Sequence, residues 1–104
     1  GRNDNLLKIL GERVELDHLQ ARIESLAGTS YAISAIPDER SGWRVILVAG
    51  DGAPVDDVQR QYNNNSLAIE RATTSKRVGK IPRNALGKLC REKLDQMLRD
   101  AEHE

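Results

Sequence analysis

Two strand-forming runs joined by a short polar segment constrain the fold of this chain more than any other feature. The runs YAISAIP (31–37) and WRVILVAG (43–50) are rich in β-branched and aromatic residues, and only DERSG (38–42) separates them. Runs of this kind, bounded by a cluster of polar residues and glycine, are typical of neighbouring strands joined by a turn. We therefore expect an antiparallel strand pair in the middle of the chain.

Three segments carry the spacing of amphipathic helices. The first (14–28) has apolar residues at intervals of three and four and ends at Gly28, which suits a left-handed helix cap. The second (54–62) opens with Pro54 at a plausible first helical position, and the third covers 90–101. The residues expected to face the core are Leu16, Leu19, Ile23 and Leu26 in the first helix, Val55, Val58 and Tyr62 in the second, and Leu94, Met97, Leu98 and Ala101 in the third.

A short hairpin is expected before the first helix. LLKILGERV (6–14) reads as two extended runs about a turn at Gly11, because glycine tolerates the backbone angles that such a turn needs. NNNS (63–66) is expected to be a turn. Segment 67–82 holds two possible strands, near 67–69 and 78–81, and Pro82 disfavours a helix just before it. This order of elements predicts an α+β fold, with a small mixed sheet and a leading β-hairpin covered by about three helices.

Length and composition limit the class of protein. A chain of 104 residues supports one core, hence one domain, and the absence of Phe makes that core aliphatic. With 16 basic and 16 acidic residues, net charge does not draw the whole chain to nucleic acid or to an anionic membrane. No apolar run reaches the length of a membrane span. The single cysteine, Cys90, excludes an internal disulfide and favours a reducing compartment, most simply the cytoplasm.

Lys88 is the strongest candidate for chemistry. It follows Gly87, stands six residues past Pro82, and precedes the last predicted helix. A lysine on a helix face needs no flexible residue before it, so this spacing indicates a charge that is aimed by a short, shaped loop. No metal site is expected, because His18 and His103 have no second histidine or cysteine at a spacing typical of metal ligands.

Basic residues gather around Lys88, and the residues alone leave two interpretations open. One is a solvated face without a function of its own. The other is a nucleic-acid surface, which is disfavoured because segment 76–93 contains no aromatic residue on which bases could stack. The basic residues of the segment are Lys76, Arg77, Lys80, Arg83, Lys88, Arg91 and Lys93, against one acidic residue, Glu92.

Two motifs give the chain a family resemblance. IPRNALGKLCR resembles the closing motif of the adenylate-forming ligases, approximately Leu/Ile-Pro-x-x-x-x-Gly-Lys-x-x-Arg, at Ile81, Pro82, Gly87, Lys88 and Arg91. GRNDNLLKILGERVE resembles a second motif of that superfamily, approximately Gly-Arg-x-Asp-x-x-x-Lys-x-x-Gly-x-x-Val/Ile-Glu, at Gly1, Arg2, Asp4, Lys8, Gly11, Val14 and Glu15. The superfamily includes acyl-CoA synthetases, nonribosomal adenylation domains and firefly-type luciferases. The two positions after the loop that are usually acidic are Asp17 and Gln20 here, so the chain departs from the pattern at Gln20, and NNNS replaces a proline-containing stretch.

The resemblance implies that 1–104 is the single, mobile C-terminal domain of a larger ligase, with residues 1–5 as the hinge region and the large N-terminal domain absent. The implied enzyme is an ATP-dependent acyl-CoA synthetase, which forms acyl-AMP and pyrophosphate and then transfers the acyl group to the thiol of coenzyme A. Its implied cofactors are ATP, coenzyme A and, through the absent domain, Mg²⁺. Its implied partners are its own N-terminal domain and a small carboxylic acid, with no nucleic acid and no membrane. The fragment alone is expected to be inactive.

The resemblance also implies roles for individual residues. Lys88 would be the catalytic lysine of adenylation, with Gly87 supporting its loop. Asp4 matches the hinge position, although a turn or cap residue is an alternative interpretation. Arg2 would lie near the nucleotide.

The loop that contains Lys8 and Gly11 would line the channel for the thiol-bearing pantetheine arm. Lys8 is equally well interpreted as an exposed strand residue. Two alternatives for the whole chain stay open: an adenylation domain that loads a carrier protein, and a non-enzymatic α+β module that binds RNA or another protein.

Overall fold

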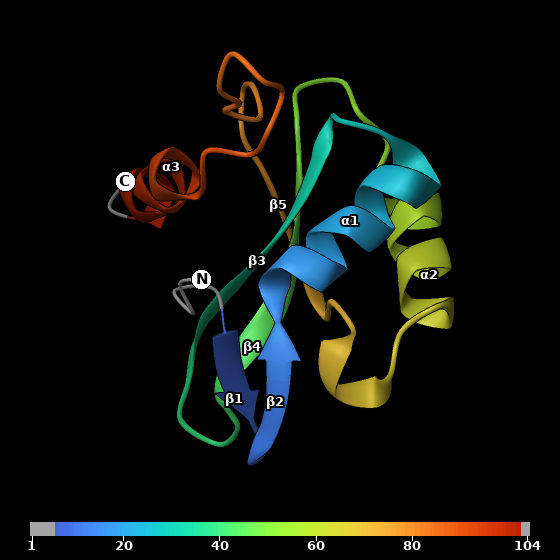
Figure 1. The fold of residues 1–104 in the computed structure, drawn as a ribbon, viewed down its shortest axis with the longest axis vertical. Coiled ribbons are helices and arrows are strands. Elements are labelled where there is room, and N and C mark those ends of the chain that lie inside the picture. The colour runs from blue at the N-terminus through green and yellow to red at the C-terminus, as the bar shows by residue number, and fades with distance from the viewer. Residues whose placement is uncertain (1–5, 103–104) are drawn as a thin grey trace.

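The chain forms a three-stranded sheet with helices on both of its faces (Figure 1). The computed structural model describes residues 6–102. The elements are β1 (Leu6–Ile9), β2 (Glu12–Glu15), α1 (Leu16–Ala27), β3 (Tyr31–Asp38), β4 (Gly42–Ala49), α2 (Asp56–Asn64), the short 3₁₀ helix η1 (Ala68–Glu70), β5 (Thr74–Arg77) and α3 (Arg91–Glu102). The expected α+β fold, with a leading hairpin, a small mixed sheet and three helices, is confirmed.

The core lies on both faces of the sheet β3-β4-β5. On one face, α1, α2 and the hairpin pack against Ile33 and Leu47. On the other face, α3 places Leu94 and Leu98 against Ile46. Figure 1 shows the same arrangement, with α1 and α2 together on one side of the sheet and α3 on the other. The predicted core positions Val55, Val58, Tyr62, Leu94, Met97 and Leu98 all belong to these two clusters, while the side chain of Ala101 lies outside the described residues.

The central strand pair forms as expected. β3 and β4 are antiparallel, with Cα partners that run from Tyr31 and Ala49 to Asp38 and Gly42 beside the turn. Gly42 has a φ of 89°, which glycine adopts without steric cost because it has no Cβ. β5 then adds to β4 in parallel, which makes the sheet a mixed one.

Helix α1 confirms the first predicted helix, with one shift in its buried face. Leu19 and Ile23 are buried, whereas Leu26 is 37% exposed. Ala27 packs against the core in its place, as expected when a period of 3.6 residues drifts along a helix. Gly28 follows the last helical residue with a φ of 95°, in the predicted cap position.

Helix α2 begins later and ends later than predicted. Its first residue is Asp56, so Pro54 lies in the preceding loop and not at the first helical position. The carbonyl of Pro54 accepts a hydrogen bond of 2.6 Å from the hydroxyl of Tyr31, which ties this residue to β3. The helix runs through Asn64, so the turn predicted at 63–66 occupies only the second half of that segment.

Both strands predicted within 67–82 are wrong. Residues 68–70 form η1, because the carboxylate of Glu70 accepts a hydrogen bond of 3.0 Å from the N–H of Leu67 and caps a tight turn. The strand near 78–81 lies earlier, at Thr74–Arg77. Val78 and Ile81 lie outside the assigned strand but are buried, and both belong to the core cluster on the α3 side of the sheet.

The hairpin and the last helix agree with prediction. β1 and β2 are antiparallel, and their turn uses positive φ at Leu10 (53°) and Gly11 (80°), as a two-residue hairpin turn requires. The N–H of Leu10 donates to the carbonyl of Ser41 at 2.9 Å, which fastens the hairpin to the β3–β4 turn. No helix within residues 6–102 is long and apolar enough to cross a membrane.

Candidate functional site

Lys88 lies on a loop between β5 and α3 that is closed at its base. We call residues 82–90 the lysine loop. Arg83 and Leu89 form an isolated antiparallel bridge, and the N–H of Cys90 donates to the carbonyl of Pro82 at 2.9 Å. The base of the loop is therefore held by backbone pairing.

Asn84 organises the tip of the lysine loop. Its Oδ1 accepts hydrogen bonds from the N–H groups of Leu86 (2.8 Å) and Lys88 (3.1 Å). Its own N–H donates to the carbonyl of Lys88 at 2.9 Å, and its carbonyl accepts from the N–H of Gly87 at 3.0 Å. Gly87 has a φ of 83°. Residues with a Cβ rarely adopt this angle, which explains physically why a glycine precedes Lys88.

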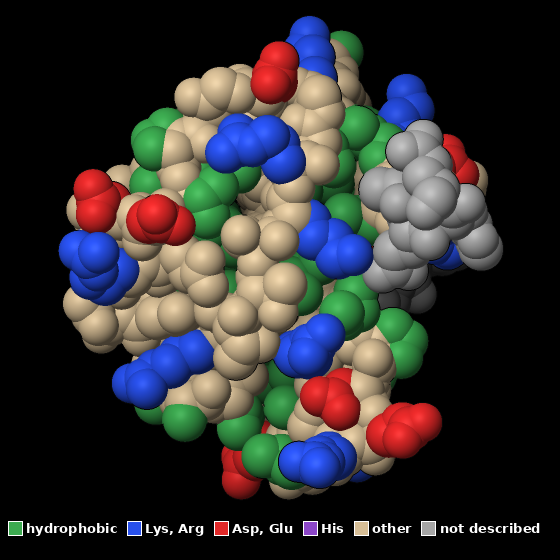
Figure 2. Space-filling model, turned by 180° about the vertical axis from the view of Figure 1, so that it is seen from behind, with side chains coloured by type: hydrophobic (Ala, Val, Ile, Leu, Met, Phe, Trp, Pro, Cys, Tyr) green, Lys and Arg blue, Asp and Glu red, His purple; other side chains and the backbone are tan. Residues whose placement is uncertain are grey.

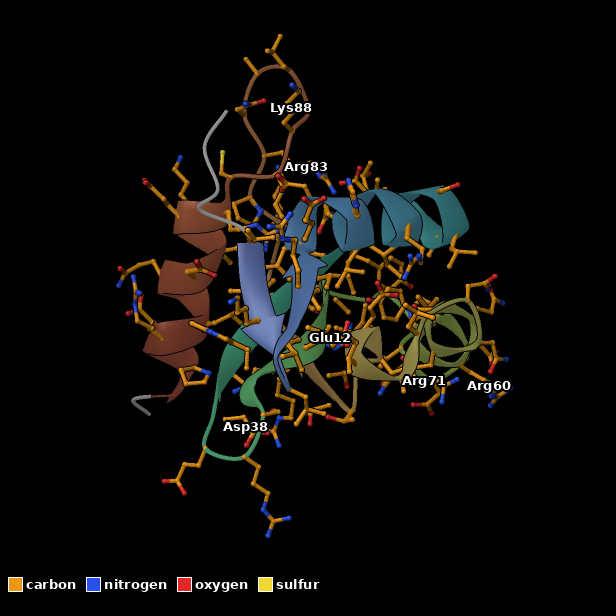
Figure 3. All side chains as sticks on the ribbon, turned by 60° about the horizontal axis from the view of Figure 1, so that its bottom comes forward. Glu12, Asp38, Arg60, Arg71, Arg83 and Lys88 are labelled. Atoms are coloured by element: carbon orange, nitrogen blue, oxygen red, sulfur yellow. The ribbon has the colours of Figure 1, made fainter. Side chains whose placement is uncertain are left out.

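Arg83 joins the lysine loop to the rest of the domain. Its Nη1 donates to the carbonyl of Gly87 at 2.9 Å. Its Nη2 donates at 3.0 Å to the carbonyl of Thr29, which follows α1. Nη1 also lies 2.9 Å from Oε2 of Glu24, and the two side chains are only 15% and 32% exposed. Figure 3 shows Arg83 on the same loop as Lys88 and close to α1.

Glu24 and Gln20 continue this network along α1. Although burial opposes its ionisation, hydrogen bonds from Gln20 and Arg83 and the charge of Arg83 hold the pKa of Glu24 below its ordinary value. The amide nitrogen of Gln20 donates to Glu24 at 2.7 Å, and its oxygen accepts from the N–H of Ile33 at 2.8 Å. Gln20, which stands where the family pattern has an acidic residue, therefore links the site to β3.

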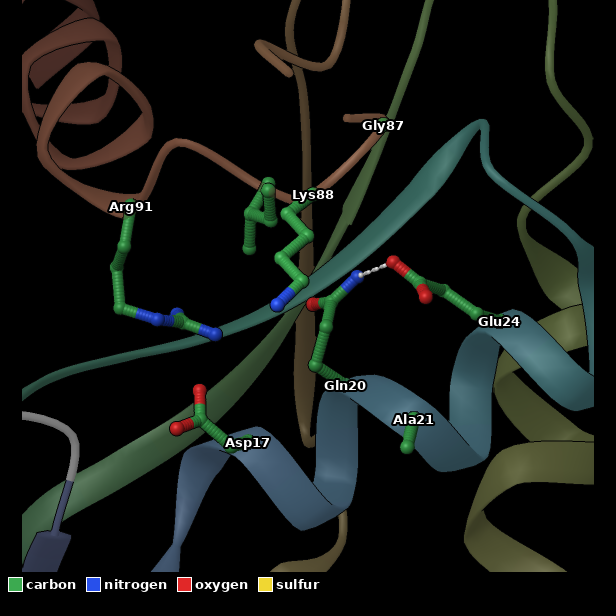
Figure 4. A pocket seen from close by; sticks show the side chains of 8 residues that line it. Asp17, Gln20, Ala21, Glu24, Gly87, Lys88 and Arg91 are labelled. Carbon is green, nitrogen blue, oxygen red and sulfur yellow. Dashed lines mark hydrogen bonds between the residues drawn. The ribbon is translucent and has the colours of Figure 1, made fainter. Parts of the chain in front are cut away.

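The side chain of Lys88 extends over a cleft of about 360 Å³ between the lysine loop and α1. Figure 4 shows it reaching from the loop toward the helix, with Arg91 on one side and Gln20 on the other. Within residues 6–102 its ammonium has no hydrogen-bond or ion-pair partner. Lys88 is therefore an exposed cation on an ordered loop. The cleft is lined by Asp17, Gln20, Ala21, Glu24, Gly87, Lys88, Leu89 and Arg91.

Arg91, the other basic residue of the closing motif, is used differently. Its Nη1 donates to the carbonyl of Ile33 at 2.8 Å. Burial lowers the pKa of Arg91, and the carboxylates of Asp17 and Asp95 act in the opposite direction. Arg91 therefore holds the start of α3 against β3, while the side chain of Lys88 reaches over the cleft toward α1.

Several basic side chains of segment 76–93 bind backbone carbonyls within the domain. Arg77 donates to the carbonyl of Gly50 at 2.6 Å, and Arg83 and Arg91 also bind backbone carbonyls. In Figure 2, which shows the molecule from behind, Lys and Arg side chains form separate groups with Asp and Glu among them. These arginines therefore have a structural role that requires no nucleic acid.

Among the other predicted site residues that the structure describes, Gly87 lies beside Lys88, whereas Lys8 and Gly11 lie away from it. Lys8 lies on β1 opposite Arg13, and Gly11 forms the hairpin turn. Figure 1 shows that turn at one end of the molecule and the lysine loop at the other. Asp4 and Arg2 lie outside the described residues.

The part of the chain that the structure describes contains no candidate metal-binding site. His18 pairs with Glu15 at 2.9 Å, and residues 6–102 contain no group of three or more His, Cys, Asp or Glu that could hold a metal ion. Cys90 is a half-buried free thiol, in line with a small packed side chain.

Sequence reasoning missed Asn84, Arg83 and Glu24 as parts of the site. Asn84 carries a usable signal, because asparagine near glycine is typical of turns that the side chain stabilises. The contact of Arg83 with Thr29 joins residues 54 positions apart, and no local pattern marks such a contact.

The fold is that of a domain found in AMP-forming acyl-CoA synthetases, so the expected resemblance is confirmed at the level of the fold. An acyl-CoA synthetase (AMP-forming)/AMP-acid ligase II-like protein from Dyadobacter fermentans matches with a TM-score of 0.74 at 18% identity, over 92% of this chain and 30% of its own. The o-succinylbenzoate CoA synthetase MenE from Bacillus subtilis matches with a TM-score of 0.70 at 22% identity, over 91% and 20%. ATP-bound MatB from Rhodopseudomonas palustris matches with a TM-score of 0.70 at 21% identity, over 97% and 21%.

The chain thus spans about a third or less of the length of these proteins. No protein-family model matches it, and no curated protein matches it either.

Proposed function

We propose that the chain is the C-terminal domain of an ATP-dependent ligase, which joins a carboxylic acid to AMP with release of pyrophosphate and then transfers the acyl group to the thiol of coenzyme A. One observation carries the proposal: Lys88 is an unpartnered cation, among residues 6–102, on a loop that Asn84 and Arg83 hold in shape. The fold and the two sequence motifs support the same assignment.

Adenylation brings two anions together. An oxygen of the carboxylate attacks the α-phosphorus, the bond to the departing pyrophosphate breaks, and negative charge builds on the phosphate oxygens. An ammonium placed there offsets that charge. Lys88 is suited to this role because lysine carries a compact charge on a long, flexible stem, and because no partner within residues 6–102 has to be given up first.

A second surface would serve the thiol step. The hairpin turn with Lys8 and Gly11 lies at the opposite end of the domain from Lys88 (Figure 1). A domain of this shape must rotate to present first one end and then the other to a single active site. Asp4 would be the pivot for that rotation, and Arg2 would lie near the nucleotide.

The remaining parts of the active site would belong to the large domain. Residues 6–102 offer no metal-binding group, so Mg²⁺ would be held elsewhere, together with the phosphates of ATP. The partners of this chain would be its own large domain, a small carboxylic acid, ATP and coenzyme A. A cytoplasmic location fits the single cysteine.

The test uses the longer protein that contains this chain. Pyrophosphate release with ATP and a panel of carboxylic acids measures adenylation, and thioester formation from supplied acyl-adenylate measures acyl transfer. Lys88→Ala should slow adenylation by about 10²- to 10³-fold and spare acyl transfer, because the lysine leaves the site when the domain turns. Lys93→Ala, which removes an exposed lysine from α3, should leave both steps unchanged.

Three results would contradict this assignment. Equal loss of both steps in Lys88→Ala would make Lys88 a structural residue. Turnover by the 104-residue chain alone would show that the active site is not shared with another domain. Transfer to a carrier protein but not to coenzyme A would identify the chain as part of a carrier-loading adenylation enzyme.

A further inference from the structure

We propose that Asn84 and Arg83 are positioning residues for Lys88: Asn84 fixes the backbone from which the ammonium projects, and Arg83 fixes the loop relative to α1. This inference rests on the proposed function of Lys88. Neither residue has to touch a substrate, because both would act through the conformation of the lysine loop.

Asn84 acts from inside the loop. Residues 84–88 are all exposed, so packing against the core does not set their conformation. Four hydrogen bonds between Asn84 and residues 86–88 do so, and two of them reach the backbone N–H and C=O of Lys88 itself. In both side-chain hydrogen bonds the acceptor is Oδ1 of Asn84. The loop therefore requires a side chain with an oxygen acceptor at position 84.

Arg83 acts at the base of the loop and links it to the rest of the domain. Its guanidinium binds the carbonyl of Gly87 on one side and the carbonyl of Thr29 on the other, which a planar fork of donors can do and a lysine cannot. Its ion pair with Glu24 is largely shielded from water. Glu24 is held in turn by Gln20, whose oxygen binds the N–H of Ile33. The loop is therefore fastened to α1 and β3.

Because of these contacts, Lys88 should move together with the whole domain and not independently of it. A loop that is closed by Asn84 and fastened by Arg83 moves with α1, so the ammonium arrives where domain rotation places it. Catalysis depends steeply on such placement, since a displacement of about 1 Å can cost about 10²-fold in rate. Loosening the loop should therefore damage adenylation while Lys88 remains present.

The first arm of the test uses the 104-residue chain and does not depend on enzymatic activity. Amide hydrogen exchange measured by NMR should show protection at Leu86, Gly87 and Lys88. Asn84→Ala should speed exchange at these three amides by about tenfold or more, while the amides of β3 and β4 keep their rates. Asn84→Ser, which restores a weaker oxygen acceptor, should recover part of the protection. Asn65→Ala, which removes another exposed turn asparagine, should leave the three amides unchanged.

The second arm uses the longer ligase. Asn84→Ala should slow adenylation by about 10- to 100-fold with little change in the KM for ATP, Asn84→Ser should recover most of that loss, and acyl transfer from supplied acyl-adenylate should be spared. Arg83→Lys keeps the charge but loses the fork, so it should slow adenylation by about tenfold. This variant also carries the test if Asn84→Ala proves unstable.

The two arms separate failure of this inference from failure of the proposed function. A wild-type ligase that forms no acyl-adenylate would refute the proposed function, while amide exchange would still decide whether Asn84 orders the loop. Unchanged exchange in Asn84→Ala, no recovery in Asn84→Ser, or equal loss of both half-reactions would each overturn the positioning role.

Discussion

The guanidinium of Arg91 donates a hydrogen bond of 2.8 Å to the backbone carbonyl of Ile33, whereas the ammonium of Lys88, three residues earlier, has no partner among residues 6–102. Two basic residues of one motif thus have separate tasks. One joins α3 to the sheet, and the other leaves its charge exposed.

This separation predicts that only one of the two substitutions to alanine lowers the stability of the domain appreciably. Arg91→Ala should lower the free energy of unfolding by roughly 1.5 to 3 kcal/mol, because it removes a hydrogen bond from a charged group and leaves a carbonyl unpaired. Lys88→Ala should change it by no more than about 0.5 kcal/mol. Urea denaturation of the 104-residue chain measures both values. Similar losses in the two variants would contradict the division of roles.

A second prediction concerns Gly87 and its left-handed backbone. Gly87→Ala should cost about 1 to 2 kcal/mol, since φ of 83° brings a Cβ into conflict with its own backbone. Gly79→Ala is the matched control, because Gly79 also has open space around it but no positive φ. The difference between their denaturation midpoints isolates the effect of the backbone angle. A Gly79→Ala variant as unstable as Gly87→Ala would rule out backbone strain as the cause.

A third prediction concerns alkaline pH. Burial raises the pKa of Tyr62 to about 12, with a hydrogen bond to Ser66 and the charge of Arg22 acting against it. A folded-state pKa above the unfolded value means that stability is fully present below about pH 10 and is lost as pH rises toward 12. The loss should reach roughly 2 to 3 kcal/mol.

Tyr62→Phe should remove that pH dependence. It should also lower stability at neutral pH by about 1 kcal/mol, because the hydroxyl donates to the carbonyl of Glu70 at 2.8 Å. Denaturation measured from pH 7 to 12 tests both statements. An equally steep alkaline decline in Tyr62→Phe would assign the effect to another group.

The fourth prediction separates the hinge from the charge. Asp4 lies outside the described residues, and its proposed role depends on backbone rotation. Asp4→Pro fixes φ near −65° and removes a donor, so it should slow acyl transfer more than adenylation in the longer ligase, the reverse of Lys88→Ala. Asp4→Ala, which leaves the backbone free to rotate, should have the smaller effect. Equal loss of both steps in Asp4→Pro would reject Asp4 as the pivot.

The sequence predicted those parts of the fold that rest on local patterns. The β3–β4 pair and α1 follow from runs and spacings that are contained within each segment. β5 was misplaced because its residues, TSKR, are polar and their strand character comes from parallel pairing with β4. The apolar residues nearby, Val78 and Ile81, pack in the core just beyond the end of the assigned strand.

In the candidate site, too, only the residues marked by a local sequence signal could be predicted. Lys88 and Gly87 stand out because a motif and a turn signal coincide in one short stretch. Arg83 shows no such signal, since its partners Thr29 and Glu24 approach it only after the chain has folded. The roles of Lys8, Arg2 and Asp4 remain predictions that require the longer protein.

Gln20 has a further consequence for the behaviour of the domain in solution. β3 is the outer strand of its sheet, and outer strands with free N–H and C=O groups recruit strands from other molecules. The carboxamide of Gln20 accepts from Ile33 and donates to the carbonyl of Tyr31 at 3.3 Å, so it imitates the peptide group of an adjoining strand. Arg91 occupies the carbonyl of Ile33. This stretch of the sheet edge, next to the lysine loop, therefore cannot pair with a strand of another molecule and does not promote aggregation.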